Sequence, residues 1–311
     1  MRTRLIPVLA VVAAVLSGAL LVPAAYARLH HAPAPVWIEA SPTPSPPTLA
    51  ATPVDINLGP GNFFAWALLD RDTGTIAGSA NRGETSTAES MIKVWIVSDY
   101  LRQLGDQQPP AHRLKEASAA IRDSDDLAAE RLYRAAGGTD VIRRLIEMCG
   151  LTDTRISTRP GHEGWWSYTE MSPRDAVRMG DCIRSGKAAG PRWTDWVLDE
   201  MTKVRGTTAA SDQPNGGRWG IVDGLPDEIL ARGRVGIKNG WTPQSYDGKW
   251  HVNCLAVADD WVLAVMMRYP YERGLDYGAS VCEKVTEQLV TPRPTHARPD
   301  AASDSPSGAE P

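Results

Sequence analysis

The sequence has no basic excess, few histidines and none of the common metal or nucleotide motifs. Its 311 residues carry 33 Lys and Arg against 37 Asp and Glu, a formal net charge of −4. Nucleic-acid-binding domains show clustered positive charge instead. The six His form no H-E-x-x-H pair, and no G-x-S-x-G elbow or G-x-x-x-x-G-K-[ST] loop occurs. We therefore expect no metal, no cofactor and no nucleic-acid partner.

Cysteine is scarce as well, and no two cysteines form a C-x-x-C pair. The four are Cys149, Cys182, Cys254 and Cys282. Their spacing does not indicate a zinc or redox site. Export would permit disulfides, and four cysteines allow three pairings. Buried free thiols remain the alternative.

The two ends of the chain have a different composition from its middle. A basic start, an apolar run and an Ala-Tyr-Ala sequence ending at Ala27 predict a signal peptide over residues 1–27. An uncleaved membrane anchor is the alternative, because the run approaches the length that spans a bilayer. Prolines predict a spacer over residues 28–60 and a disordered tail over 291–311, which leaves one domain over 61–290. We expect a secreted, extracytoplasmic protein.

Hydrophobic periodicity divides the domain into strands, helices and strands again. Together they predict an α/β (α+β) fold, in which an antiparallel sheet from both chain ends is flanked by helices and holds an inserted all-helical subdomain. Strands are predicted at 63–70, 75–79, 234–238, 250–258 and 261–269. Helices are predicted from Ser90, over 117–149 as two helices split at Gly137-Gly138, from the Ser172 cap to 183, and over 277–289.

A serine and a lysine lie one helical turn apart in Ser90-Met91-Ile92-Lys93. Residues at i and i+3 share a helical face, so Lys93 can reach the Ser90 oxygen. A desolvated lysine, its pKa below the usual value of about 10.4, can accept the serine proton and activate the hydroxyl. The helix N-terminus adds N–H donors where an oxyanion would form. Alone, S-x-x-K is a frequent chance match, so its meaning depends on the other motifs around it in the sequence.

Two more motifs follow in order, Ser124-Asp125-Asp126 in the helical middle and Lys238-Asn239-Gly240 at a strand end. Class A β-lactamases and penicillin-binding proteins carry S-x-x-K, S-D-N and K-T-G in this order. Here the second and third motifs differ by one residue each. The flanking segments also resemble this superfamily over nearly all of residues 63–289. The resemblance implies a β-lactamase/transpeptidase-like fold.

The resemblance also implies a role for each motif residue. Ser90 would be acylated, Lys93 would activate it, and Ser124 would relay a proton to the leaving amine. The N–H groups of Ser90 and Trp241 would form the oxyanion hole. The substrate-binding residues implied in this way are Lys238, which would hold a carboxylate, and Asn239, Trp241 and Asp126.

Several residues depart from the family pattern. Asp126 replaces Asn, and a carboxylate at neutral pH accepts hydrogen bonds but donates none. Asn239 replaces Thr or Ser. The E-x-x-L-N loop, whose Glu activates the deacylating water in class A β-lactamases, has no counterpart in residues 157–170. Glu163 is the nearest candidate for that role, with an exposed loop carboxylate as the alternative.

These features leave three functional hypotheses open. The first is an exported serine hydrolase that forms an acyl-enzyme with a β-lactam or a related amide or ester. The second is a D-alanyl-D-alanine carboxypeptidase-like cell-wall enzyme, which needs no deacylating Glu. The third is a catalytically weak cell-wall-binding protein. The expected partner is a small β-lactam or a peptidoglycan peptide, and the protein is expected to be a monomer.

Overall fold

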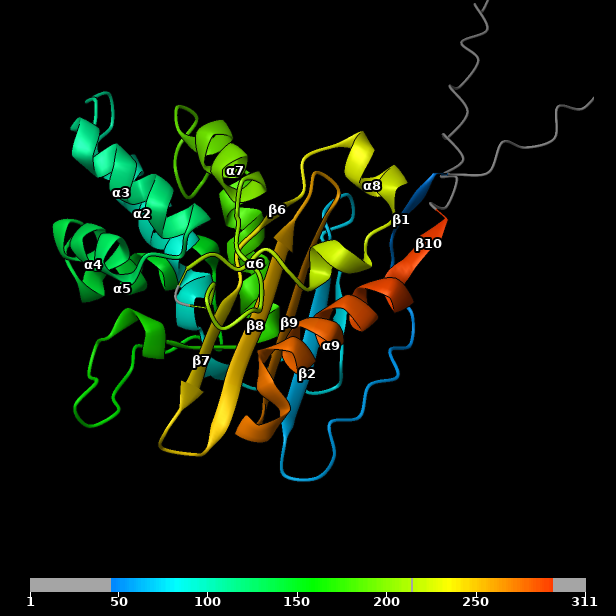
Figure 1. Ribbon diagram of the computed structural model, residues 1–311. Helices are drawn as coiled ribbons and strands as arrows, with labels where there is room; N and C mark the ends of the chain where they lie inside the picture. Colours follow the sequence, from blue (N-terminus) through cyan, green and yellow to red (C-terminus); the bar gives the residue numbers. More distant parts are fainter. Residues whose placement is uncertain (1–45, 214, 293–311) are drawn as a thin grey trace, which may run out of the picture. The chain divides into compact units, whose positions relative to one another are not determined.

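A six-stranded antiparallel sheet joins the early and late parts of the chain (Figure 1). The structure, a computed structural model, describes residues 46–213 and 215–292. The predicted signal peptide, most of the spacer and nearly all of the tail lie outside the described residues. The strands of the sheet are β2 (Phe63–Asp70), β3 (Ile76–Gly78), β6 (Gly236–Ile237), β7 (Gly240–Gln244), β8 (Lys249–Val257) and β9 (Trp261–Pro270).

The strand order is β3-β2-β9-β8-β6, and β7 also pairs with β8. All pairs are antiparallel. The sheet predicted from both chain ends is therefore confirmed, including the central strands. Strand β7 was not predicted: its glycine and proline lower strand propensity, and only the β8 edge gives it a place.

Helices cover both faces of this sheet and form a separate group beside β7 (Figure 1). The helices are α2 (Lys93–Gln103), α3 (Ala111–Arg122), α4 (Asp126–Ala135), α5 (Thr139–Cys149), α6 (Pro173–Arg184), α7 (Thr194–Thr202), α8 (Asp227–Arg232) and α9 (Gly274–Leu289). The 3-10 turns are η1 (Glu89–Ile92), η2 (Trp166–Tyr168), η3 (Ile221–Gly224) and η4 (Tyr271–Arg273).

Helices α6 and α9 pack closely on opposite faces of the sheet. A Cβ added to Gly180 of α6 would lie 2.5 Å from Val262, and one added to Gly278 of α9 would lie 2.4 Å from the Tyr269 hydroxyl. Val262 and Tyr269 are seven residues apart on β9, so their side chains point to opposite faces. Glycine at both helix positions permits this close packing.

The helical middle contains three helices where two were predicted between residues 117 and 149. The first begins earlier, at Ala111, and the chain breaks again around Ser124, between α3 and α4. Ser124 has a φ of 56°, which no helix tolerates, and the Asp125 carboxylate then caps α4 by accepting the Ala128 N–H. The break was missed because its residues are polar and do not interrupt the apolar pattern.

The spacer and tail were predicted to stay outside the folded domain, and this is wrong at their inner ends. Strand β1 (Pro47–Leu49) pairs with β10 (Val290–Pro292). Thr48 and Leu49 are buried. Proline is tolerated in such a short edge strand, because only some backbone N–H groups of the strand face its partner strand. A second small pair joins β4 (Ser86–Thr87) to β5 (Glu170–Met171).

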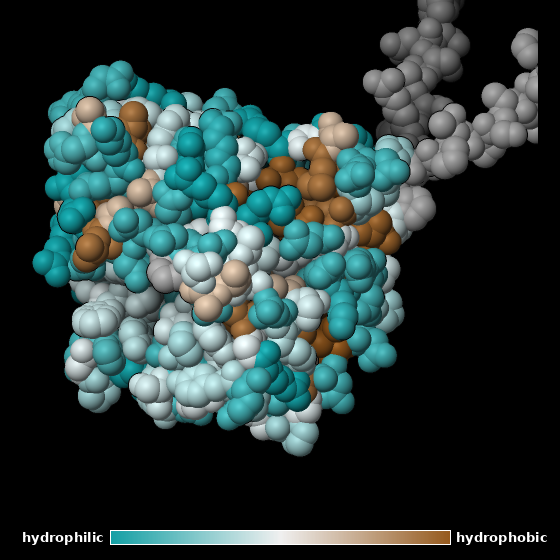
Figure 2. Space-filling view, in the orientation of Figure 1, coloured by the Kyte–Doolittle hydropathy of each residue, from teal (hydrophilic) through white to brown (hydrophobic). Residues whose placement is uncertain are grey.

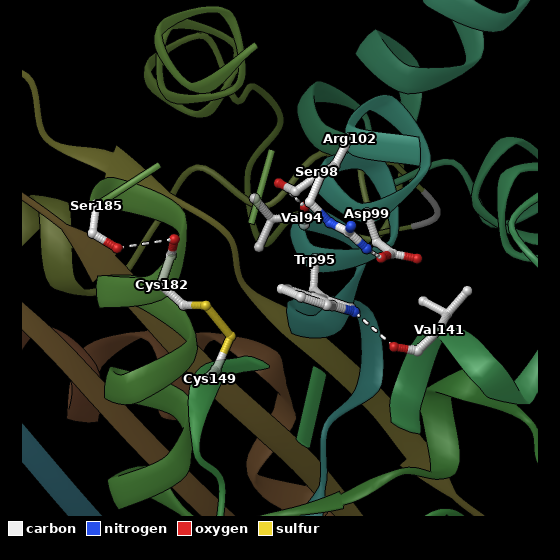
Figure 3. The surroundings of a disulfide bond; sticks show 9 residues. All are labelled: Val94, Trp95, Ser98, Asp99, Arg102, Val141, Cys149, Cys182 and Ser185. Atoms are coloured by element: carbon white, nitrogen blue, oxygen red, sulfur yellow. Dashed lines mark hydrogen bonds and ion pairs between the residues drawn. A yellow bond between two sulfur atoms is a disulfide. The ribbon is translucent and has the colours of Figure 1, made fainter. Parts of the chain in front are cut away.

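All four cysteines form disulfides, Cys149–Cys182 and Cys254–Cys282. The first ties the end of α5 to α6, next to the buried Trp95 (Figure 3). The second ties α9 to β8. Each closes a loop of about thirty residues and is expected to stabilise the fold by about 3 kcal/mol.

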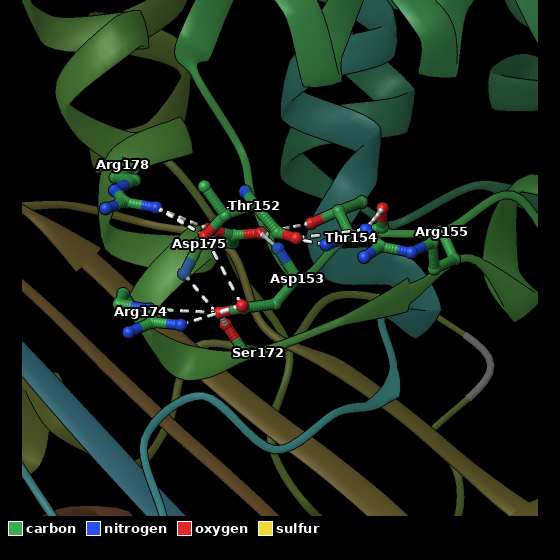
Figure 4. A network of polar contacts seen from close by, with 8 residues as sticks. All are labelled: Thr152, Asp153, Thr154, Arg155, Ser172, Arg174, Asp175 and Arg178. Atoms are coloured by element: carbon green, nitrogen blue, oxygen red, sulfur yellow. Dashed lines mark hydrogen bonds and ion pairs between the residues drawn. The ribbon is translucent and has the colours of Figure 1, made fainter.

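A buried carboxylate fixes the start of α6 (Figure 4). The Ser172 hydroxyl caps the helix by accepting the Asp175 N–H at 3.1 Å, as predicted. The fully buried Asp175 carboxylate accepts the backbone N–H groups of residues 152–154 at 2.7–3.2 Å and a bond from Arg178 at 3.0 Å. The cap therefore also anchors the segment that leads to the loop containing Glu163.

The surface over the helices beside β7 is mostly hydrophilic, and the larger hydrophobic patches lie near α8 and α9 (Figure 2). Within residues 46–213 and 215–292, no helix combines the length and the apolar character needed to cross a bilayer.

Candidate active site

Residues of the S-x-x-K and S-D-D motifs line one cavity of about 560 Å³ together with Trp241, which follows the K-N-G motif. Lys93 and Lys238 are not among the lining residues and join this site through their contacts with Ser124. Ser90 reaches it from η1, Ser124 and Asp126 from the junction of α3 and α4, and Trp241 from β7. Aromatic residues of the loop between α5 and α6 complete the wall: Trp165, Trp166 and Tyr168. Residues more than 150 positions apart in the sequence therefore face one space.

The backbone is strained on both sides of the cavity. Glu89 and Ser124 have φ values of 49° and 56°, and they are the non-glycine residues with positive φ in the described ranges. Each such residue costs of the order of 1 kcal/mol, and such strain is typical of functional sites. The two strained turns carry Ser90 and Ser124, which line the same cavity.

The Lys93 amine is fully buried and lies against the second motif. It donates to Asp126 Oδ1 at 2.5 Å, to the Ser124 carbonyl oxygen, and to Ser124 Oγ at 3.3 Å, and it lies 5.1 Å from the centre of the Trp166 ring. Burial lowers the pKa of Lys93, while the charge of Asp126 opposes that shift. In the described residues the Ser90 hydroxyl has no hydrogen-bond partner, so the predicted Lys93–Ser90 contact is replaced by Lys93–Asp126.

Lys238 is buried without a counter-ion. Its amine donates to Ser124 Oγ at 2.8 Å and to the Asn239 carbonyl oxygen at 3.2 Å, and no carboxylate of the described residues forms an ion pair with it. Burial lowers the pKa of Lys238 well below its usual value, and the nearby charge of Lys93 lowers it further, while the charges of Asp126 and Asp123 oppose this shift. Ser124 thus stands between two buried amines, and in the described residues no carboxylate is close enough to pair with Lys238.

Strand β7 passes very close to η1, the turn that carries Ser90. A Cβ added to Gly240 would lie 2.7 Å from the Ser90 nitrogen and 2.5 Å from the Met91 nitrogen. Any side chain at this position would push the strand away from η1. Glycine therefore lets the backbone at Trp241 approach Ser90, the arrangement that two converging N–H donors require.

The sequence also matches a model of a known protein family. A family model described as the beta-lactamase enzyme family matches residues 111–286, more than half of the chain. The chain belongs to the β-lactamase enzyme family.

Individual proteins and solved structures resemble this chain at low sequence identity. Proteins named lipoprotein LppW from Mycobacterium tuberculosis and Mycobacterium bovis are 30% identical to this chain over 199 residues, which cover 63% of this chain and 59% of theirs. The solved structure of PBP-A has a TM-score of 0.55 and 18% identity, covering 74% of this chain and 89% of that one. A class A β-lactamase from Mycobacterium abscessus has a TM-score of 0.53 and 18% identity, covering 74% and 93%. At these identities the structures show a shared fold.

Within this β-lactamase family fold, Asn239 does not lie where the resemblance implies. Its side chain is almost fully buried and donates to the carbonyl oxygens of Gly217 at 2.8 Å and Trp219 at 2.7 Å. Both amide hydrogens are used, and Asn239 is not among the residues that line the cavity. The structure places it behind the wall, where it holds the segment that faces β7.

Glu163 does not lie in the cavity of this β-lactamase family member either. It is exposed, and neighbouring Gly164 and Trp165 line the wall in its place. A different acid, which was not predicted from the sequence, does line the cavity: Glu89 is 2% exposed and directly precedes Ser90. Its position directly before Ser90 was the only signal for it in the sequence. In the described part of the chain, no group of three or more His, Cys, Asp or Glu side chains is placed to hold a metal ion.

The Lys93–Asp126 pair gives a first prediction. Asp126→Asn removes the charge that opposes the lowered pKa of Lys93 and provides an amide donor at the cavity. We expect acylation by penicillin near pH 7 to be about tenfold faster, and the acidic limb of its pH profile to move to lower pH. Stopped-flow acylation rates between pH 5 and 9 would measure this effect.

The matched control for this variant is Asp195→Asn. The Asp195 side chain is 82% exposed and paired with Arg234, against 79% exposed for Asp126. Asp195→Asn should leave the pH profile of acylation unchanged. An unshifted acidic limb in Asp126→Asn would contradict a role of Lys93 as the base.

Proposed function

We propose that this protein is an extracytoplasmic serine hydrolase that forms an acyl-enzyme at Ser90 with a β-lactam or a related amide or ester. The observation that carries the proposal is the position of Ser124 Oγ, 2.8 Å from the Lys238 amine and 3.3 Å from the Lys93 amine, at the cavity that Ser90 lines. A nucleophile and a proton relay thus line one cavity, and the base lies behind the relay and within hydrogen-bond distance of it.

The acylation step uses these groups in sequence. Neutral Lys93 accepts the Ser90 hydroxyl proton while Ser90 Oγ bonds to the carbonyl carbon, and the N–H groups of Ser90 and Trp241 hold the oxyanion. When the C–N bond breaks, the leaving nitrogen takes the Ser124 hydroxyl proton, and Lys93 returns its proton to Ser124. Asp126 must release Lys93 first, and its exposed carboxylate can be hydrated once it turns away from the buried amine.

The electrostatics of Lys238 favour an anionic substrate. A buried amine without a counter-ion is costly, and a carboxylate within about 4 Å stabilises its charged form. A substrate carboxylate would supply the directly paired counter-ion that Lys238 lacks. Penicillins carry such a carboxylate, and so does the C-terminus of a cell-wall peptide.

A second candidate function rests on Glu163. With this carboxylate outside the cavity, water activation after acylation lacks the residue that the resemblance suggested. A slow deacylation suits a D-alanyl-D-alanine carboxypeptidase-like enzyme that penicillin blocks. A mutant of PBP-A, whose fold is shared here, has been solved as an acyl-enzyme complex with penicillin G.

The proposed location rests on two observations. Both disulfides require an oxidising compartment to form and persist. The LppW relatives are named lipoproteins, a class of proteins attached to membranes from outside the cytoplasm. Oxidised thiols in protein isolated from its own cells, measured by mass after alkylation, would support the location, and free thiols would contradict it.

One experiment separates the functions. The purified full chain is incubated with a fluorescent penicillin and, separately, with nitrocefin, and the labelled peptide is mapped. Sustained nitrocefin turnover supports the β-lactam hydrolase. A stable adduct on Ser90 without turnover supports the peptidase, and the absence of both turnover and adduct would contradict both.

A further inference from the structure

Glu89 connects strand β7 to η1, which carries the proposed nucleophile Ser90 and is called the nucleophile turn below. Its carboxyl group lies 2.5 Å from Thr87 Oγ1, 2.7 Å from Thr242 Oγ1 and 2.8 Å from Gln244 Nε2. Thr242 and Gln244 belong to β7, while Glu89 begins η1. The contact to Thr242 therefore joins the neighbours of Ser90 and Trp241, the two residues whose N–H groups would hold the oxyanion.

The contacts continue from Thr87 into the sheet. Thr87 Oγ1 lies 2.6 Å from His251 Nδ1, and His251 Nε2 lies 2.9 Å from Asp247 Oδ2. His251 is 1% exposed and faces Thr242 in the register of β7 and β8. Five side chains thus form one chain of four contacts, from Thr242 through Glu89, Thr87 and His251 to Asp247.

The number of hydrogens in this chain is too small when both carboxyl groups are ionised and the imidazole is neutral. Each of the four contacts needs one hydrogen, and the side chains then supply three, from two threonine hydroxyls and one imidazole N–H. One contact would have two lone pairs facing each other. The Trp241 carbonyl oxygen, 2.7 Å from Thr242 Oγ1, adds a further acceptor. The chain is complete only with an additional proton.

The surroundings favour Glu89 as the site of that proton. Burial raises the pKa of Glu89, the hydrogen bonds from Thr87, Thr242 and Gln244 oppose this shift, and the Asp126 charge adds to it; the net direction is upward. Burial lowers the pKa of His251; Asp247 opposes this shift, and the charges of Arg268 and Arg159 add to it. Of the remaining neighbours, the Lys93 cation favours ionised Glu89, while the hydroxyls of Tyr168 and Tyr246 lie nearby as neutral groups.

We propose that Glu89, Thr87 and His251 share one proton in a buried chain that holds β7 against the nucleophile turn, and that Glu89 is thereby a positioning residue for the oxyanion hole. The inference rests on the proposed function at Ser90. Protonated Glu89 satisfies all four contacts. Loss of the proton at alkaline pH leaves one contact repulsive, so the N–H groups of Ser90 and Trp241 move apart and acylation slows.

Glu89→Gln is the direct test, because the amide keeps the shape, supplies hydrogens and does not titrate. The melting temperature of the full chain is measured from pH 4.5 to 9. A carboxyl whose folded pKa is raised contributes stability below its unfolded pKa of about 4.3 and loses it as pH rises through the folded value. The melting temperature of the wild type should therefore fall by about 3 °C relative to that of Glu89→Gln between pH 4.5 and 9. A constant difference between the two proteins would overturn the proton chain.

Acylation kinetics supply the second readout. Glu89→Leu, which cannot hydrogen bond, should lower the acylation rate constant about tenfold or more at pH 7 with little change in the dissociation constant of penicillin. Glu89→Gln should retain the rate and lack the alkaline decline of the wild type. Equal alkaline declines in wild type and Glu89→Gln would contradict the positioning role.

The two proposals fail in distinguishable ways. If penicillin never labels the wild type, the proposed function is wrong, but the melting-temperature comparison still decides whether Glu89 holds the proton. If Glu89→Gln does not fold, Thr87→Val serves instead, since it separates Glu89 from His251 without changing charge. The pH dependence of its melting temperature should differ from that of the wild type. An identical dependence would overturn the proposed proton chain.

Discussion

Replacing Ser90 with alanine is expected to abolish covalent capture of penicillin, with a loss of at least about 1,000-fold in the acylation rate. The hydroxyl lines the cavity, and its turn places it beside the strand that carries the second N–H donor. Since the Ser90 side chain makes no hydrogen bond within the described residues, the variant should keep the melting temperature of the wild type. Gel fluorescence and calorimetry would measure the two effects.

Ser167→Ala is the matched control for this variant. Ser167 also lines the cavity but belongs to η2 and no motif. It should label at the wild-type rate. Labelling of Ser90→Ala at more than a small fraction of that rate would place the nucleophile elsewhere and contradict the proposed mechanism.

The three motifs could be found from the sequence because each is short and local, while the catalytic roles of their residues stay predictions. The order of Ser90, Ser124 and Lys238 needed no knowledge of packing, and the strands around them have strong apolar patterns. The local pattern did not reveal where the side chains point. Asn239 turns behind the wall because two carbonyl oxygens, at positions 217 and 219, accept its amide hydrogens.

Long-range contacts explain what was missed. Glu89 and His251 are 162 positions apart, and each alone is an ordinary residue in a strand or turn; only the register of β7 and β8 brings them to Thr87. Strand β1 was hidden by its prolines and depends on its partner Val290–Pro292. Glu163 was chosen for its place in the sequence, but the 3-10 turn and the preceding loop put aromatic residues on the cavity wall instead.

Replacing Lys238 with methionine is expected to have opposite effects on function and stability. Methionine has nearly the same length and no charge, so it fills the buried space but offers nothing to a carboxylate. Acylation by penicillin should slow by at least about 100-fold, because charge-assisted recognition in a buried site is lost. Thermodynamic stability near pH 7 should rise by about 1 kcal/mol, because folding no longer buries an amine without a counter-ion.

The pH dependence gives this prediction its sign. Burial holds the pKa of Lys238 well below its usual value in the folded protein. The folded state therefore binds fewer protons than the unfolded state between that lowered pKa and about 10.4, and wild-type stability rises with pH across this window. Lys238→Met should lack this rise, so its advantage is largest at neutral pH and disappears above about pH 10.4.

Urea unfolding from pH 6 to 10.5, combined with acylation rates at pH 7, would measure both effects. The exposed Lys187 provides the control, since Lys187→Met should change neither quantity. A Lys238→Met variant that is less stable than the wild type at pH 7 would mean that the amine is well compensated in the folded protein. The proposed role of a substrate carboxylate as the missing charge would then be wrong, even if acylation slowed.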